Sequence, residues 1–107
     1  MRVEKAVWAS RLKEARLAAG LSQRQLGINV GLDPFVASTR INRYEQGIHK
    51  PDYGIAQRIA KELEIPTAFL YCDDEYLAAL LLLLGQLDES GMEKVKRYAD
   101  ALLKQRT

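Results

Sequence analysis

Residues 38–46 carry side chains with the chemistry of nucleic-acid recognition. Hydroxyl, amide and guanidinium groups hydrogen-bond the base edges and phosphates of a DNA major groove. Glu45 is the one acid in this segment. Thr39 and Arg43 are four residues apart and would share one face of a helix, where an arginine can bond guanine in a bidentate way. The candidate DNA-binding residues here are Ser38, Thr39, Arg40, Asn42, Arg43 and Gln46; the plain alternative is a solvated polar face.

A helix must present these side chains, and the sequence predicts its ends. Asp33 followed by Pro34 resembles an N-cap with proline at the first helical position, and Gly47 is a typical stop. We therefore expect a helix over residues 34–46. Its apolar side, which should face the core, consists of Ala37, Ile41 and Tyr44.

A shorter helix is predicted just before it. Ser22 and Gln25 form a capping box, in which the hydroxyl accepts from the amide three residues on. Leu26 and Val30 fall on one face, and Gly31 can take the left-handed conformation that closes a helix. Two short helices joined by a glycine turn, the second with a polar outer face, describe a helix-turn-helix.

These two helices resemble the helix-turn-helix of the lambda repressor and Cro class, often called the Xre family, and the resemblance covers residues 8–71. It implies a five-helix DNA-binding domain. The family pattern can be aligned by counting forward from Gln23 or by counting back from Glu45, and the two alignments differ by four residues. The segment 32–37 therefore contains an insertion, which we expect as an extra turn at the start of the second helix. The matching residues are Leu21-Ser22-Gln23, Leu26, Gly31, Ile41, Arg43, Glu45, Gly47 and Pro51.

The resemblance also implies roles for residues outside the polar cluster. Gln23 would contact a backbone phosphate, as would Gln46, His49 and Lys50 beyond the second helix. For His49 a loop residue without a role is an equal alternative. The resemblance further implies a structural ion pair between Arg16 and Glu45, for which the alternative is a solvated carboxylate; an acid facing inward needs a partner to offset desolvation.

Phe35 lies inside the inserted segment, and its role stays open at this point. It could touch a thymine methyl group, or it could pack into the core as a hydrophobic staple.

Three further helices complete the expected five-helix domain over residues 1–71. Apolar residues recur at helical spacing in residues 6–19, which end at Gly20. Asp52 is a plausible N-cap for a helix through Leu63, and residues 66–71 suggest a short fifth helix. Core positions of the first and fourth helices are Trp8, Leu12, Ala15, Ala19, Ile55, Ile59 and Leu63.

Residues 72–107 predict two more helices, and the first is apolar almost all round. Asp73 would cap a helix through Leu87, and a capping box of Ser90 with Glu93 would start the next. That last helix has one apolar stripe, which cannot cover a whole circumference of leucines. We infer that part of the leucine surface is buried against a second copy of the chain, with an intrachain core as the alternative. The proposed dimerisation residues are Leu77, Leu80, Leu81 and Leu84, and the stripe is Met92, Val95, Ala99 and Leu102.

Composition is that of an ordinary globular protein, with 107 residues, 48% hydrophobic and 28% charged. Residues 1–71 hold eleven Lys or Arg against seven Asp or Glu, whereas residues 72–107 hold five against seven, so the first part is basic. The single cysteine cannot form an intramolecular disulfide, and one thiol with one histidine does not make a metal site. No cofactor is expected. We expect a cytoplasmic protein, because no leader pattern precedes Arg11 and the apolar run 77–84 is too short to span a bilayer.

These observations favour a sequence-specific transcriptional regulator of the repressor type that binds double-stranded DNA, at a palindromic operator, as a dimer. An antitoxin with the same DNA-binding domain, or a helical interaction module without DNA, are the alternatives. A neighbouring toxin gene would favour the first alternative and failure to bind duplex DNA at low salt the second. Catalysis is not expected, since the sequence has no Gly-rich phosphate loop and no paired carboxylates in an apolar setting.

Overall fold

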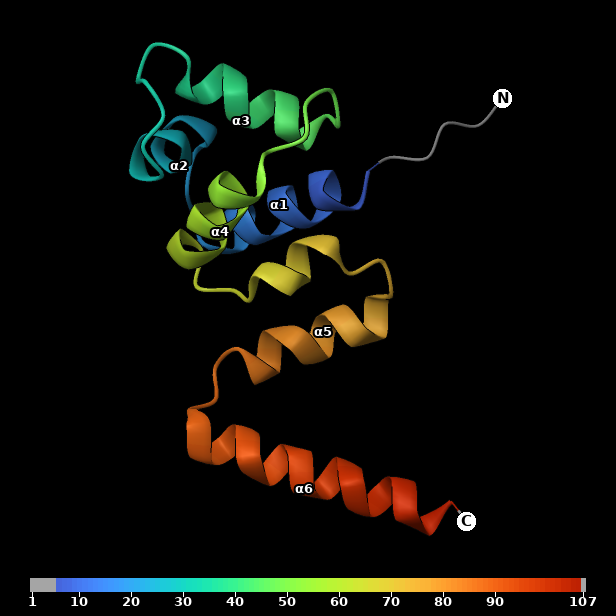
Figure 1. The fold of residues 1–107 in the computed structure, drawn as a ribbon. Coiled ribbons are helices and arrows are strands. Elements are labelled where there is room, and N and C mark those ends of the chain that lie inside the picture. The colour runs from blue at the N-terminus through green and yellow to red at the C-terminus, as the bar shows by residue number, and fades with distance from the viewer. Residues whose placement is uncertain (1–5, 107) are drawn as a thin grey trace, which may run out of the picture.

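The computed structural model describes residues 6–106, and the regular structure in that range is helical (Figure 1). The expected all-α fold is confirmed. The first four helices and a short 3₁₀ helix gather at one end of the molecule, and the last two helices follow toward the other end. In chain order the elements are α1 (Val7–Ala18), α2 (Gln23–Asn29), α3 (Ala37–Glu45), α4 (Tyr53–Glu62), the 3₁₀ helix η1 (Thr67–Tyr71), α5 (Glu75–Leu84) and α6 (Glu89–Gln105).

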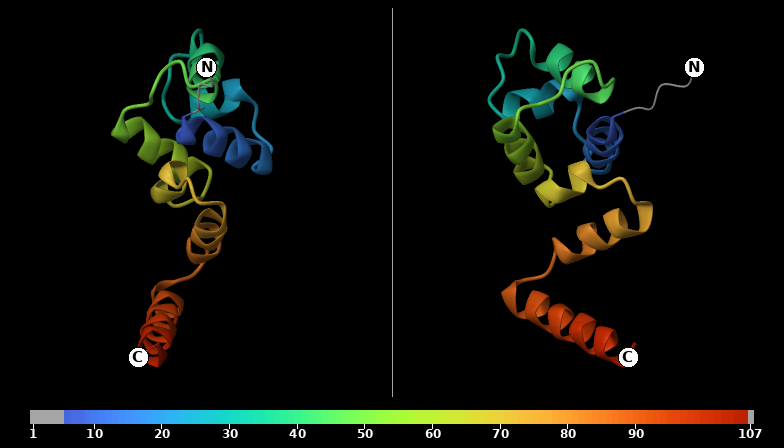
Figure 2. Two further views of the ribbon diagram at one scale, coloured as in Figure 1. Left: turned by 90° about the vertical axis from the view of Figure 1, so that its right-hand side faces the viewer. Right: turned by 45° about the vertical axis from the view of Figure 1, so that its right-hand side comes forward.

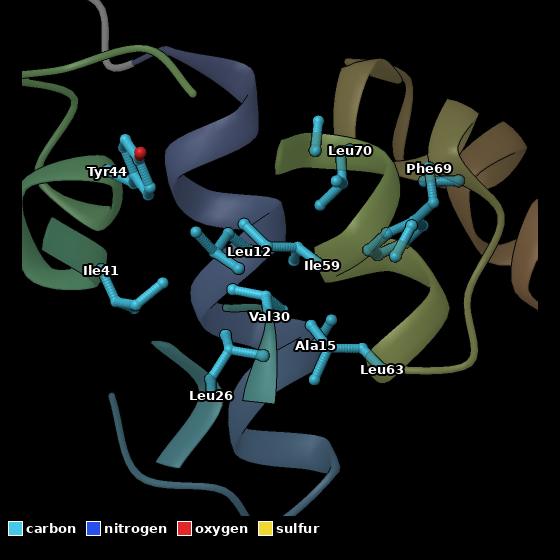
Figure 3. Close-up of a cluster of buried hydrophobic side chains, with 13 residues drawn as sticks. Leu12, Ala15, Leu26, Val30, Ile41, Tyr44, Ile59, Leu63, Phe69 and Leu70 are labelled. Carbon is cyan, nitrogen blue, oxygen red and sulfur yellow. The ribbon is translucent and has the colours of Figure 1, made fainter. Parts of the chain in front are cut away.

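The core lies among the first five elements, and each of them contributes one large, fully buried apolar side chain (Figure 3). Burial of such side chains is the main favourable term in folding. Because every element supplies one, α3 is held on the same core as α1, α2 and α4. The five side chains are Leu12, Leu26, Ile41, Ile59 and Phe69.

The contact between α2 and α3 is close because α2 carries a glycine where it meets α3. A Cβ atom built on Gly27 would lie 2.7 Å from the Cβ and 2.9 Å from the carbonyl oxygen of Ala37. Ser22 Oγ accepts from the amide of Gln25 at 2.9 Å, and Gly31 has a φ of +94°, so the predicted start and end of α2 are confirmed.

The start of α3 differs from the prediction, because the helix begins at Ala37 and not at Pro34. Asp33 Oδ1 accepts from the amide of Phe35 at 2.9 Å, and the Asp33 carbonyl accepts from the amide of Val36 at 3.0 Å. An aspartate that bonds the backbone two residues on favours a turn over a helix. The insertion is therefore a turn ahead of α3 and not an extra helical turn.

Both C-terminal helices begin at a different cap from the one expected. Asp74, not Asp73, caps α5 by accepting from Leu77, and α5 ends at Leu84, short of the expected Leu87. Asp88 caps α6 by accepting from the amide of Gly91 at 2.8 Å. The negative charge of Asp88 is stabilised at the positive end of the helix, and Ser90 lies inside the first turn.

α6 stands apart from the rest of the molecule, at the end opposite α3 (Figure 2). No residue of α6 is buried, and Ala78 is the one buried residue of α5. The apolar stripe of α6 and much of the leucine surface of α5 are thus exposed to solvent.

Candidate nucleic-acid interface

The polar side of α3 faces away from the core. All six residues of the predicted polar cluster are exposed: five lie on α3 and Gln46 is its C-cap, whereas the other four positions of α3 are buried. The separation follows from the helical period: the apolar residues recur every three or four positions, so the polar ones occupy the outer half of the circumference. The exposed residues are Ser38, Thr39, Arg40, Asn42, Arg43 and Gln46, and the buried ones are Ala37, Ile41, Tyr44 and Glu45.

The two guanidiniums of α3 carry uncompensated positive charge. Across residues 6–106, no acidic side chain forms an ion pair with Arg40 or Arg43. Arg40 Nη2 donates to the hydroxyl of Tyr44 at 2.9 Å and its guanidinium lies 5.8 Å from the centre of that ring. Tyr44 thus holds Arg40 in place without neutralising it.

An ion pair beneath this surface ties α1 to the end of α3. Arg16 Nε donates to Glu45 Oε2 at 2.6 Å and Arg16 Nη2 donates to Glu45 Oε1 at 3.1 Å. Glu45 is 1% exposed, and Arg16 also donates to the carbonyl of Leu21 at 2.9 Å. The bidentate geometry fixes the orientation of both planar groups as well as their distance.

Gln23 connects α2 to α3 through its side-chain amide. Its Nε2 donates to Asn42 Oδ1 and to Glu45 Oε1, both at 3.1 Å. A glutamine amide has two N–H donors, so both are engaged here. In this conformation the side chain braces the two helices, and the expected phosphate contact would require it to leave one acceptor.

A hollow of about 330 Å³ lies beside the C-terminal end of α3, with four of its six lining residues able to carry positive charge. Lys50 Nζ lies 5.6 Å from the centre of the Trp8 ring, a cation–π contact that places the ammonium group at the edge of α1. Asp52 is the one acid of the lining, and its Oδ1 accepts from the amide of Ile55 at 2.8 Å. The lining residues are Arg40, Arg43, Tyr44, His49, Lys50 and Asp52.

The inserted turn displays an apolar side chain that the sequence left ambiguous. Phe35 is 98% exposed and Val36 is exposed beside it. Packing of Phe35 into the core is therefore wrong. Exposure could not be deduced from the sequence, because the conformation of the inserted segment 32–37 was left open.

An outward polar and basic helix, braced by a shorter one on a five-element core, defines a helix-turn-helix protein of the lambda repressor and Cro class. The comparison with protein families agrees: the helix-turn-helix family matches residues 12–70. The chain belongs to that family, as a transcriptional regulator.

Two similar proteins are named as a transcriptional repressor and a transcriptional regulator. The chain is 28% identical over 104 residues to the cryptic phage CTXphi transcriptional repressor RstR of Vibrio cholerae, with 91% of this chain and 88% of that protein covered. It is also similar to the crystal structure of the transcriptional regulator BswR, with 39% identity and a TM-score of 0.85 over 92% of this chain and 98% of that one.

Two negative findings concern residues 6–106 only. None of the helices there has both the length and the apolar character needed to cross a membrane. The same part of the chain contains no group of three or more His, Cys, Asp or Glu side chains that could hold a metal ion.

Proposed function

We propose that this protein binds a palindromic DNA operator as a homodimer and represses transcription. The observation that carries the proposal is the outer face of α3, where two guanidiniums without acidic partners lie among hydroxyl and amide groups. A relative named as a transcriptional repressor supports the sign of regulation. The proposed role is one of binding, in the cytoplasm, without catalysis or cofactor.

The proposed DNA contacts fall into two groups, base contacts and phosphate contacts, according to where the residues lie on the structure. Residues on the outer face of α3 would meet base edges, since the recognition helix of this motif lies in the major groove. Residues at the two ends of the motif would meet phosphates, which set the register without selecting sequence. We assign Ser38, Thr39, Arg40, Asn42 and Arg43 to the bases, and Gln23, Gln46 and Lys50 to the phosphates.

The dimer is proposed from the exposed apolar surface of the last two helices. Leu77 is 49% and Leu80 40% exposed, and Leu81 and Leu84 are half-buried beside them. A contiguous apolar surface of this kind is typical of a protein–protein interface. A second copy brings the matching surface, its own α5 and the stripe of α6, in an isologous two-fold contact. Residues 1–71 then form the DNA-binding domain and residues 72–107 the dimerisation element.

Selection of bound duplexes from a random pool tests function and symmetry together. We expect an inverted repeat with half-sites about 34 Å apart, as two-fold related recognition helices require. A matched control is the chain with Thr39→Ala and Arg43→Ala, which should fold normally but enrich no repeat. A single half-site without symmetry would overturn the dimer, and no enrichment at all would overturn DNA recognition.

A further inference from the structure

Phe35 is the most exposed large apolar residue among those described, at 98%. Single exposed apolar residues are common on protein surfaces, so exposure alone means little. What distinguishes Phe35 is that its backbone is fixed. The amide of Phe35 donates to Asp33 Oδ1, the next amide closes the turn on the Asp33 carbonyl, and Pro34 has a restricted φ. The ring is therefore displayed on an ordered turn, which lowers the entropy lost when it meets a partner.

The turn continues the proposed DNA-binding face. Phe35 lies two residues before Ala37, where α3 begins, and Ala37 is fully buried against Gly27 of α2. In Figures 1 and 2 the connection between α2 and α3 lies at the same end of the molecule as α3, away from α6. In the helix-turn-helix motif the N-terminal residues of the recognition helix contact the base edges. A side chain just ahead of that end would enter the groove next to them.

We propose that Phe35 contacts the C5-methyl group of a thymine in the major groove, and so determines specificity at one position of each half-site. This inference rests on the proposed function. A phenyl ring has no hydrogen-bonding group, and thymine is the one standard base with a methyl group in the major groove. Asp33, two residues before Phe35 in the sequence, accepts from the amide of Phe35 through Oδ1. The partner is accordingly the apolar edge of a base and not a phosphate.

The test compares wild-type protein with Phe35→Ala in parallel selections from random duplex DNA. The wild type should require thymine at one position of each half-site, and Phe35→Ala should accept any base there while keeping the rest of the operator. On the selected operator, thymine is then replaced by uracil at that position, which removes one methyl group. This should weaken binding by the wild type about four-fold, the equivalent of burying one methyl group, and binding by Phe35→Ala by less than about two-fold.

Leu17→Ala is the matched control, because Leu17 is another exposed apolar side chain, but on α1. It should show the same uracil penalty as the wild type. Equal uracil penalties for wild type and Phe35→Ala, or identical selected sequences, would overturn the inference while leaving the proposed function intact. If the wild type selected no sequence, the proposed function would fail first.

Discussion

Arg11 of α1 and Glu75 of α5 are joined across 64 positions of sequence, with Arg11 Nη2 donating to Glu75 Oε1 at 3.1 Å. Arg11 is 5% exposed; its Nε donates to the carbonyl of Cys72 at 2.8 Å and its guanidinium lies 5.4 Å from the centre of the Phe69 ring. Burial by itself lowers the pKa of Arg11, but hydrogen bonds and charge from Glu75 and Glu14 outweigh it and raise the pKa above its usual value. Arg11 therefore keeps its positive charge.

This arrangement predicts unequal effects for its two partners. The Glu75 side chain is 87% exposed, so its ion pair is screened by solvent and Glu75→Gln should change the free energy of unfolding by less than about 1 kcal/mol. Arg11→Met leaves the Cys72 carbonyl without its charged donor and should cost about 1–3 kcal/mol. Urea unfolding of both variants measures the difference. Equal costs would mean that the exposed ion pair, and not the hydrogen bond to the Cys72 carbonyl, holds α5 in place.

The second prediction follows from the close approach of Gly27 in α2 to Ala37 in α3. Gly27→Ala would place its Cβ 2.9 Å from the carbonyl oxygen of Ala37, so α2 and α3 must separate, at a cost of about 1–3 kcal/mol. Gly54→Ala is the matched control, because its Cβ would have Asp52 Oδ1 at 3.4 Å as its nearest neighbour and the helix propensity of alanine is higher. Thermal denaturation should show a lower midpoint for the first variant and an unchanged or higher one for the second. A stable Gly27→Ala would show that the two helices are not in close contact.

Much of the fold could be predicted because its signals are local. Ser22 and Asp52 are caps with a single candidate acceptor at the right place, and both helices begin where predicted. Where two acceptors stand close together, as with Asp88 and Ser90, local spacing does not decide between them. The predicted start of α3 was wrong for a related reason. Asp33 next to Pro34 is compatible with both a helix N-terminus and a turn.

The contacts that hold the site are harder to predict, because they join distant residues. Arg16 and Glu45 are 29 positions apart and could be paired only through the family resemblance. Arg11 was missed altogether, although a signal existed. It occupies a helical position in line with Trp8 and Ala15, and an arginine inside an apolar stripe indicates a buried partner. Which partner that is depends on where α5 packs.

Arg43 and Lys50 should differ in what their loss does to DNA binding. Arg43→Ala removes a proposed base contact and should cost about 1–3 kcal/mol on the selected operator, with relaxed specificity at one position. Lys50→Ala removes a proposed phosphate contact, so it should weaken all sequences alike and lower the slope of log affinity against log salt by about one. Binding titrations at several salt concentrations, on operator and random duplexes, separate the two effects. Uniform loss for both variants would refute the assignment of base and phosphate roles.

The last prediction concerns the proposed dimer and follows from the exposed leucines of α5. Leu80→Lys places a charge at the centre of the proposed interface, where a second copy would have to desolvate it. Because Leu80 is already 40% exposed in one chain, the variant should fold, but its mass by light scattering should be that of a monomer where the wild type gives a dimer. Leu17→Lys changes an exposed leucine on α1 and should leave the dimer intact. A monomeric wild type, or a dimer unaffected by Leu80→Lys, would contradict the interface. If the interface is as proposed, the Leu80→Lys monomer should still bind a single half-site weakly, because α3 lies at the opposite end of the molecule from α6.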